Sequence, residues 1–250
     1  MVHARKRLDT SELRRRKLPS ESELAVFRQS LLHWFRRHGR RFPWRSKSAG
    51  NYTRVISEIL LQRTQAQRVG EFFNDFLTAY PSWRHLADAT ERELQQFLQP
   101  LGLWRRRATS IVALAREMKR RHGRFPSRRE EVEALPGVGQ YIANAILLFC
   151  HGEPQPLLDV NMARVLERNF GSRNLVDIRY DPYLQALATK TLSTTDPSNL
   201  NWAILDLAGL VCLSNKPLCR KCPLASSCLF GRRLMIETAG PSAGNAIRIA

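Results

Sequence analysis

The sequence predicts an all-α protein, and three observations carry that prediction. Apolar residues recur three and four positions apart through most of the chain, the spacing that places them on one face of a helix. No segment alternates convincingly between apolar and polar residues, so no strand is expected. The connections between the periodic stretches are short. Helices are expected over residues 20–39, 52–64, 66–79, 90–98, 104–121, 128–134, 140–150, 160–169, 180–192 and 197–211.

Capping boxes support three of these helix starts. In a capping box, a serine or threonine side chain accepts a hydrogen bond from the backbone of a glutamate three positions on, whose side chain accepts one in return. The three pairs are Ser20 with Glu23, Thr90 with Glu93, and Ser127 with Glu130. Residues 1–19 are interpreted as a basic disordered arm and residues 231–250 as a flexible tail.

The charge balance favours a polyanionic partner. The 250 residues include 40 basic and 22 acidic side chains, a formal net charge of +18. Nucleic acid is the first candidate partner and an acidic membrane surface the second. No run of about 18 apolar residues exists, which excludes a transmembrane helix. The N-terminus is charged where a secretory signal is apolar, so a cytoplasmic, nucleoid-associated monomer is expected.

Four of the five cysteines fall within 17 positions near the C-terminus, in the pattern Cys212-x6-Cys219-x2-Cys222-x5-Cys228. Because a reducing cytoplasm disfavours disulfides, metal ligation is the first interpretation. Zinc sites usually come as paired C-x2-C knuckles, and only one is present here. An iron–sulfur cubane accepts four thiolates at irregular spacing. The pattern favours a [4Fe–4S] cluster, with zinc second and disulfides third, and Cys150 is expected to be an inert core residue.

The segment Leu135-Pro-Gly-Val-Gly139 separates two short predicted helices. Its two glycines allow a tight turn whose backbone amides, together with the following helix N-terminus, suit one phosphate. A plain helix–helix turn is the alternative. Val138 is expected at the exposed tip of the turn, and an apolar residue in that position favours the functional interpretation.

Two acidic residues have both a structural and a functional interpretation. Asp159 precedes an amphipathic helix, where aspartate most often acts as an N-cap. Asp159 also follows the hairpin by about twenty residues and is preceded by two leucines. These neighbours would place its carboxylate beside phosphates in a partly dry cleft, an arrangement that is typical of a reacting centre. Glu58 lies on the face formed by Arg54, Gln62 and Gln65, which taken alone is expected to be solvated and to hold an Arg–Glu pair.

Together these motifs resemble the helix-hairpin-helix DNA glycosylase superfamily, in the iron–sulfur branch that contains endonuclease III and the adenine mismatch glycosylases. The resemblance covers about residues 21–230 and rests on LPGVG, on LLDVN with Asp159, and on the cysteine pattern. It implies a six-helix barrel over residues 48–154 and an iron–sulfur lobe built from residues 20–47 and 155–230. Double-stranded DNA with a mismatched base is expected across the cleft between the lobes, with the target base flipped out.

The resemblance also assigns catalytic roles. Bifunctional members of the family carry a lysine nucleophile at the position of Tyr141, so this chain is expected to be monofunctional and to lack lyase activity. Asp159 matches the catalytic aspartate, which stabilises the positive charge on a sugar that loses its base. Glu58 matches the glutamate that protonates the purine ring in adenine glycosylases. Tyr141 is expected against the same sugar.

The expected DNA contacts come from the hairpin, two wedge segments, the helix after Asp159 and the cysteine loops. Gln62 matches the family's intercalating glutamine, and Leu103 stands in the wedge loop LGLWRRRA. The basic residues of the cysteine loops either offset the charge of the cluster or contact phosphate, or do both. The expected contact residues are Gln62, Arg63, Leu103, Gly137, Val138, Gly139, Asn161, Arg164, Lys216 and Lys221.

Three candidate functions remain. Three features favour the compact enzymes that remove thymine or uracil opposite guanine. They are Leu103 in place of a tyrosine, Arg63 in place of a second glutamine, and a chain that ends soon after the cysteines. The segments VISEILLQRTQAQRV and RRFPWR resemble the enzymes that remove adenine opposite guanine or 8-oxoguanine. A non-catalytic DNA-binding module is the third candidate, although such a module has no reason to keep both Asp159 and Glu58.

Overall fold

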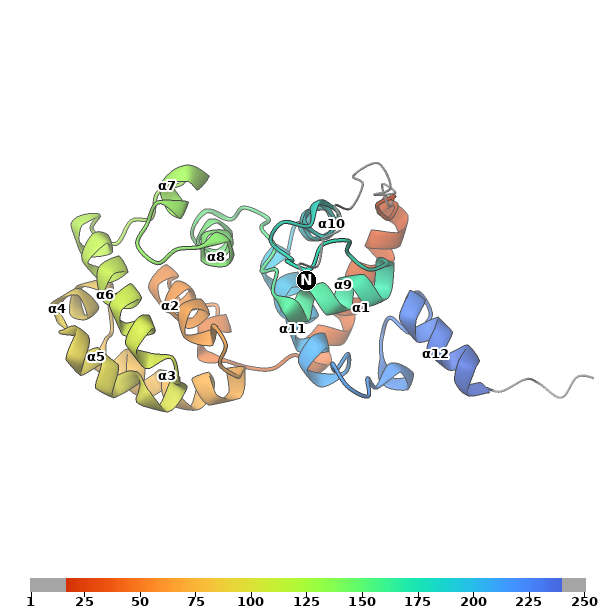
Figure 1. Cartoon of the computed structure of the whole chain (residues 1–250), viewed down its shortest axis with the longest axis horizontal. Coiled ribbons are helices and arrows are strands. Elements are labelled where there is room, and N and C mark those ends of the chain that lie inside the picture. The colour runs from red at the N-terminus through yellow and green to blue at the C-terminus, as the bar shows by residue number, and fades with distance from the viewer. Residues whose placement is uncertain (1–16, 240–250) are drawn as a thin grey trace, which may run out of the picture. The chain divides into compact units, whose positions relative to one another are not determined.

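The computed structural model describes residues 17–239 and is built from helices (Figure 1). No strand occurs among these residues, which confirms the all-α prediction. Of the arm expected over residues 1–19, residues 1–16 lie outside the described residues, and so does the end of the expected tail, residues 240–250. No helix in the described part of the chain is long and apolar enough to cross a membrane. The described part of the chain divides into two compact units, residues 38–157 with 192–201 and residues 17–37 with 158–191 and 202–239.

The first unit packs a series of helices around one apolar core. Helix α6 packs against α4 and α5, and α2 packs against α8, as Figure 1 shows. The core is rich in aromatic rings, and Trp44 and Phe73 form a T-shaped pair with 5.0 Å between ring centroids. The helices of this unit are α2 (Asn51–Leu61), α3 (Ala66–Ala79), α4 (Trp83–Asp88), α5 (Glu91–Leu98), α6 (Trp104–Arg120), α7 (Arg129–Glu133) and α8 (Gln140–His151).

The division differs from the expected one at residues 38–47, 155–157 and 192–201. Residues 38–47 belong to the unit of the hairpin because Trp44 is buried in that unit's core and stacks on Phe42. Residues 192–201 join the same unit because the Asn201 side chain bonds the loop before residue 158. Its oxygen accepts from the Leu157 amide at 2.7 Å, and its nitrogen donates to the Gln155 carbonyl at 3.0 Å.

The second unit contains the helices α1 (Glu21–His38), α9 (Val160–Phe170), α10 (Pro182–Leu192) and α12 (Leu229–Ala239), together with most of α11 (Pro197–Leu210). Arg28 on α1 donates to the carbonyls of Thr191 at 2.9 Å and Lys190 at 2.6 Å, which joins α1 to the end of α10. Helix α12 packs against α9. Residues 231–239, expected to be part of a flexible tail, are therefore helical, since this packing gives the segment a partner surface.

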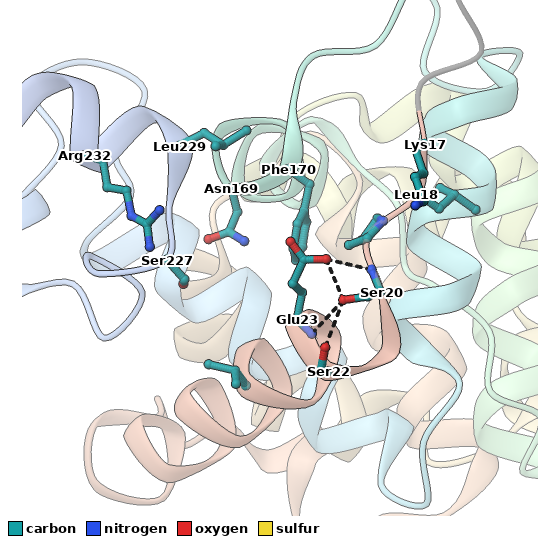
Figure 2. A pocket seen from close by; sticks show the side chains of 12 residues that line it. Lys17, Leu18, Ser20, Ser22, Glu23, Asn169, Phe170, Ser227, Leu229 and Arg232 are labelled. Carbon is teal, nitrogen blue, oxygen red and sulfur yellow. Dashed lines mark hydrogen bonds between the residues drawn. The ribbon is translucent and has the colours of Figure 1, made fainter.

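Two of the three expected capping boxes form. Thr90 and Glu93 exchange both bonds at the start of α5. Ser20 and Glu23 do the same before α1, as Figure 2 shows. The box expected at Ser127 is wrong, because α7 begins one residue too late and its N-cap is Arg128.

A cavity of about 580 Å³ lies beside the start of α1 (Figure 2). Glu23 and Phe170 line it, and so does Arg232 of α12. Asn169 also lines it, and its side-chain oxygen is buried without a hydrogen-bond partner among the described residues.

Candidate functional site

Glu58 and Tyr141 form a buried polar pair. Glu58 lies on α2 with 2% of its surface exposed, and the Tyr141 hydroxyl on α8 donates to Glu58 Oε2 at 2.8 Å. The packing of α2 against α8 brings together two residues that are 83 positions apart in the chain. A buried carboxylate needs such a partner because burial without one is costly. The expectation that the Arg54–Gln65 face is solvated is therefore wrong at Glu58.

The hairpin Leu135–Gly139 leads directly into α8. Gly137 has a φ of +72°, and a Cβ built on it lies 3.0 Å from the Cβ of Ser110 on α6. Both the left-handed backbone and this close approach require glycine at position 137. The expectation that Val138 projects into solvent is wrong. Its side chain is buried in the unit's core because the turn folds back onto that core, and its amide donates to the Leu135 carbonyl at 3.1 Å.

Gly139 differs from Gly137 in its backbone conformation and in the space around its Cα. It is the N-cap of α8 with an ordinary φ of −101°. A Cβ built on Gly139 meets no atom within 4 Å. Neither backbone strain nor crowding inside the chain thus requires glycine at position 139. The backbone of Gly139 is open to close approach from outside.

Asp159 is the N-cap of α9, and the structural interpretation of this residue is confirmed. Its Oδ1 accepts from the amides of Asn161 at 2.9 Å and Met162 at 2.8 Å. Its Oδ2 accepts from the Asn161 side-chain nitrogen at 2.6 Å. Three donors therefore hold the carboxylate in one orientation while it stays partly exposed. Capping and a chemical role are compatible, because a fixed and partly exposed carboxylate is what electrostatic stabilisation requires.

Arg164 binds the interior of its own unit. Its guanidinium donates to the carbonyls of Cys212 at 2.9 Å and Ala208 at 3.0 Å, and to the Asn161 side-chain oxygen at 3.2 Å. This places Arg164 behind Asn161, which in turn holds Asp159. Contacts of Arg164 and Asn161 with DNA stay predictions.

Gln62, Arg63 and Leu103 lie on two exposed loops. Gln62 and Arg63 follow the end of α2, and Leu103 precedes α6 with 54% of its surface exposed. Sequence reasoning missed the residue behind them, Arg107, which is buried and bonds both loops. It stands in a run of three arginines whose first two members are exposed, so the sequence offers no signal that separates it.

All four C-terminal cysteines line one small cavity together with Arg168, Phe230 and Gly231. None of the four forms a disulfide. The Arg168 guanidinium donates to Cys212 Sγ at 3.4 Å, and the Gly231 amide donates to Cys228 Sγ at 3.4 Å. Burial raises the pKa of Cys222 to about 11. Within residues 17–239, no three histidine, cysteine, aspartate or glutamate side chains are grouped so as to hold a single metal ion. A cubane does not require such a group, because each of its four thiolates binds a different iron.

The remaining expected residues lie around this cavity or in the core. Lys216 and Lys221 are exposed on the loops between the cysteines, and Lys216 has a φ of +50°. Cys150 is mostly buried on α8, and burial raises its pKa to about 12, so it is an inert core thiol.

Comparison with known proteins adds independent evidence. Residues 56–179 match the HhH-GPD superfamily of base excision DNA repair proteins. The chain is 36% identical over 216 residues to a thymine-DNA glycosylase of Aeropyrum pernix, an alignment that covers 84% of this chain and 96% of the relative. It is 36% identical over 219 residues to a thymine/uracil-DNA glycosylase of Pyrobaculum aerophilum, covering 85% and 95%. An adenine DNA glycosylase of Buchnera aphidicola is 34% identical over 209 residues, covering 81% of this chain and 58% of the relative.

A solved structure agrees with these relatives. The structure of a thermostable thymine-DNA glycosylase matches with a TM-score of 0.77 and 28% identity, covering 85% of this chain and 98% of the other. The chain therefore belongs to the HhH-GPD superfamily of base excision DNA repair proteins. The prediction of a DNA glycosylase is confirmed as the enzyme class, and the predicted absence of lyase activity stays a prediction.

Proposed function

We propose that this glycosylase is monofunctional and removes thymine or uracil mispaired with guanine. The observation that carries the proposal is the Tyr141–Glu58 pair. The position where bifunctional relatives are expected to carry a nucleophilic lysine holds a tyrosine instead, and its hydroxyl is bonded to a buried carboxylate. With no amine at this position, water is the nucleophile that replaces the base. The thymine and thymine/uracil glycosylases among the relatives support the choice of base.

Hydrolysis breaks the bond between the base nitrogen and C1′ of the sugar. The bonding electrons leave with the base, a water oxygen bonds C1′, and the proton released from water balances the charge of the departing base. Asp159 stabilises the positive charge that develops on the sugar, and its three donors prevent it from turning away. A preorganised electrostatic partner of this kind contributes roughly 3–4 kcal/mol to lowering the barrier.

Glu58 and Tyr141 act on the departing base. A base leaves more readily when it gains a proton or a hydrogen bond as the bond breaks. Tyr141 fixes the Glu58 carboxyl at one oxygen, Oε2. We assign Tyr141 as a positioning residue and Glu58 as the group that holds or supplies the proton.

The hairpin supplies a phosphate site in this proposal. The open backbone at Gly139 and the N-terminus of α8 together form a surface that a phosphate can approach closely. The formal charge of +18 strengthens attraction to the DNA backbone.

We further propose that Cys212, Cys219, Cys222 and Cys228 hold a [4Fe–4S] cluster with a structural role. The convergence of the four thiols on one cavity supports this, as do the N–H donors of Arg168 and Gly231 to their sulfurs. The cluster would cross-link the segment after α11, and the reaction needs no step at the cluster. A brown protein with an iron content of about four per chain is expected, and zinc without iron would contradict the assignment.

Removal of adenine is the second candidate function. The adenine glycosylases among the relatives support it, as does the buried carboxyl of Glu58, which matches the glutamate expected to protonate the purine ring in such enzymes. One experiment separates the candidates. Duplexes with G·T, G·U, G·A or 8-oxoguanine·A are incubated with the protein and then treated with alkali. A break at thymine or uracil only after alkali is expected, a break at adenine supports the second candidate, and no break in any duplex contradicts both.

A further inference from the structure

We propose that Arg107 is a positioning residue that fastens two DNA-facing loops to each other, so that both enter the duplex as one rigid wedge. The first loop, residues 62–64, carries Gln62 and Arg63. The second loop, residues 101–103, carries Leu103. This inference rests on the proposed base removal, because only an enzyme that extrudes a base from a duplex needs such a wedge.

The guanidinium of Arg107 reaches both loops. Its Nη2 donates to the Gln62 carbonyl at 2.6 Å and to Thr64 Oγ1 at 3.0 Å. Its Nη1 donates to the Gly102 carbonyl at 3.0 Å. The Thr64 hydroxyl donates to the Leu101 carbonyl at 3.2 Å, which closes a direct link between the loops. A single side chain from the first turn of α6 thus joins segments that are almost forty residues apart.

The backbone shows why these loops need fastening. Arg63 and Leu103 both adopt left-handed conformations, with φ of 56° and 51°, which are unfavourable for residues with a Cβ. Two of the carbonyls that accept from Arg107, those of Gln62 and Gly102, belong to the residues just before Arg63 and Leu103. Arg107 therefore holds the peptide group that sets the direction of each exposed side chain.

The burial of Arg107 argues against an incidental contact. Only 6% of its surface is exposed, and burial lowers the pKa of its guanidinium. A buried cation is retained only where its donors are well satisfied. The planar fork of arginine can bond two loops at once, whereas the single nitrogen of lysine cannot span them in the same way.

The test compares Arg107→Met and Arg107→Lys with Arg116→Met. Arg116 is exposed on the same helix, so its substitution removes the same charge from the same element and should change nothing. Amide hydrogen exchange is expected to rise at residues 62–64 and 101–103 together in both Arg107 variants, and least in Arg107→Lys. Faster exchange in one loop alone, or in neither, would overturn the coupling. This readout needs no DNA, so it tests the inference even if the proposed function fails.

The second readout is excision under single-turnover conditions. For the mispaired base that the wild-type protein removes, Arg107→Met is expected to slow excision at least tenfold. The same base placed in an unpaired bulge is expected to show a much smaller loss, because less wedging is needed to extrude it. Equal losses on the two substrates would mean that Arg107 serves only stability, and no loss on either would refute its role. An inactive wild-type protein would instead contradict the proposed function.

Discussion

The unit that contains α2 and α8 and the unit that contains α9 each position an acidic side chain, but they do so by different means. Glu58 is held by a tyrosine 83 residues away, and the pair exists only because two helices pack together. Asp159 is held by donors two and three residues away, within the first turn of its own helix. Long-range placement depends on the whole core, whereas local placement depends on one helix start. The two carboxylates should therefore respond differently to substitution.

The largest expected effect comes from Asp159→Asn. Asparagine is as good an N-cap as aspartate, so the two backbone bonds are kept, and the free energy of unfolding should fall by only about 1 kcal/mol because the bond from the Asn161 side chain is lost. Because the negative charge is lost, single-turnover excision should slow by about 10²- to 10³-fold. Denaturant unfolding and the excision assay measure the two quantities on the same preparation. Unchanged excision would leave Asp159 with its capping role only.

Glu58→Gln should have the next largest effect. Glutamine keeps the shape of the side chain and still accepts from Tyr141, but it cannot hold a transferable proton. Excision should slow by about 100-fold, as is usual when a general acid or base is lost. Tyr141→Phe serves as the partner variant, with a smaller loss of rate and a loss of about 1 kcal/mol in stability because the buried carboxylate loses a donor. A larger loss of rate in Tyr141→Phe than in Glu58→Gln would mean that the tyrosine, and not the glutamate, acts on the substrate.

The two hairpin glycines allow a matched comparison. Gly137→Ala should lower the free energy of unfolding by about 1–2 kcal/mol, since its backbone is left-handed and Ser110 lies close. Gly139→Ala should fold normally but bind duplex DNA more weakly, because its methyl group occupies open space where a phosphate is proposed. Urea unfolding and fluorescence anisotropy with a labelled duplex separate the two effects. Wild-type affinity in Gly139→Ala would remove the proposed phosphate site.

The last expected effect is on acid stability. The fully buried Asp181 accepts from the amides of Asn174, Leu175 and Leu184 at 2.7–2.8 Å. Burial works to raise the pKa of this carboxyl, but the three donors together hold it below its usual value. Its contribution to stability is therefore present above the unfolded pKa of about 3.9 and is lost as the pH falls toward the folded value.

Asp181→Asn should cost about 1–3 kcal/mol at neutral pH, because one acceptor oxygen is replaced by a donor that faces backbone amides. The difference from the wild type should shrink below about pH 4. Urea unfolding between pH 3 and pH 7 checks both statements. A difference that stays constant over this range would show that the carboxylate charge is not involved.

The sequence predicted most of the helices because their signals are local. The box of Thr90 with Glu93 and the cap at Asp159 need only residues three positions apart or closer. Helix α4 has six residues, too few for a periodic pattern, and it was missed. Helix α12 was missed because it is stabilised by packing against α9. The sequence of residues 229–239 alone does not show that α9 offers a surface for this packing.

The site was predictable in its residue types but not in its contacts. Glu58, Tyr141 and Asp159 were identified through a family resemblance; membership in the family is confirmed, and the catalytic roles of these residues stay predictions. The burial of Glu58 and Val138 could not be predicted, because each depends on which helix covers it. Arg107 could not be predicted at all, because it is one of three consecutive arginines and the sequence does not indicate which of them is buried.

Two residues on one face of helix α6 each hold another segment of the chain in place. Arg107 fastens the wedge loops, and Ser110, three residues later, lies against Gly137 of the hairpin. Residues three apart point in nearly the same direction from a helix. One inserted residue between them would rotate the second anchorage by about 100° and separate the two. The spacing of Arg107 and Ser110 on α6 therefore fixes the positions of two segments of the chain at once. We expect the fold to accept inserted or deleted residues in α6 only outside the interval from Arg107 to Ser110.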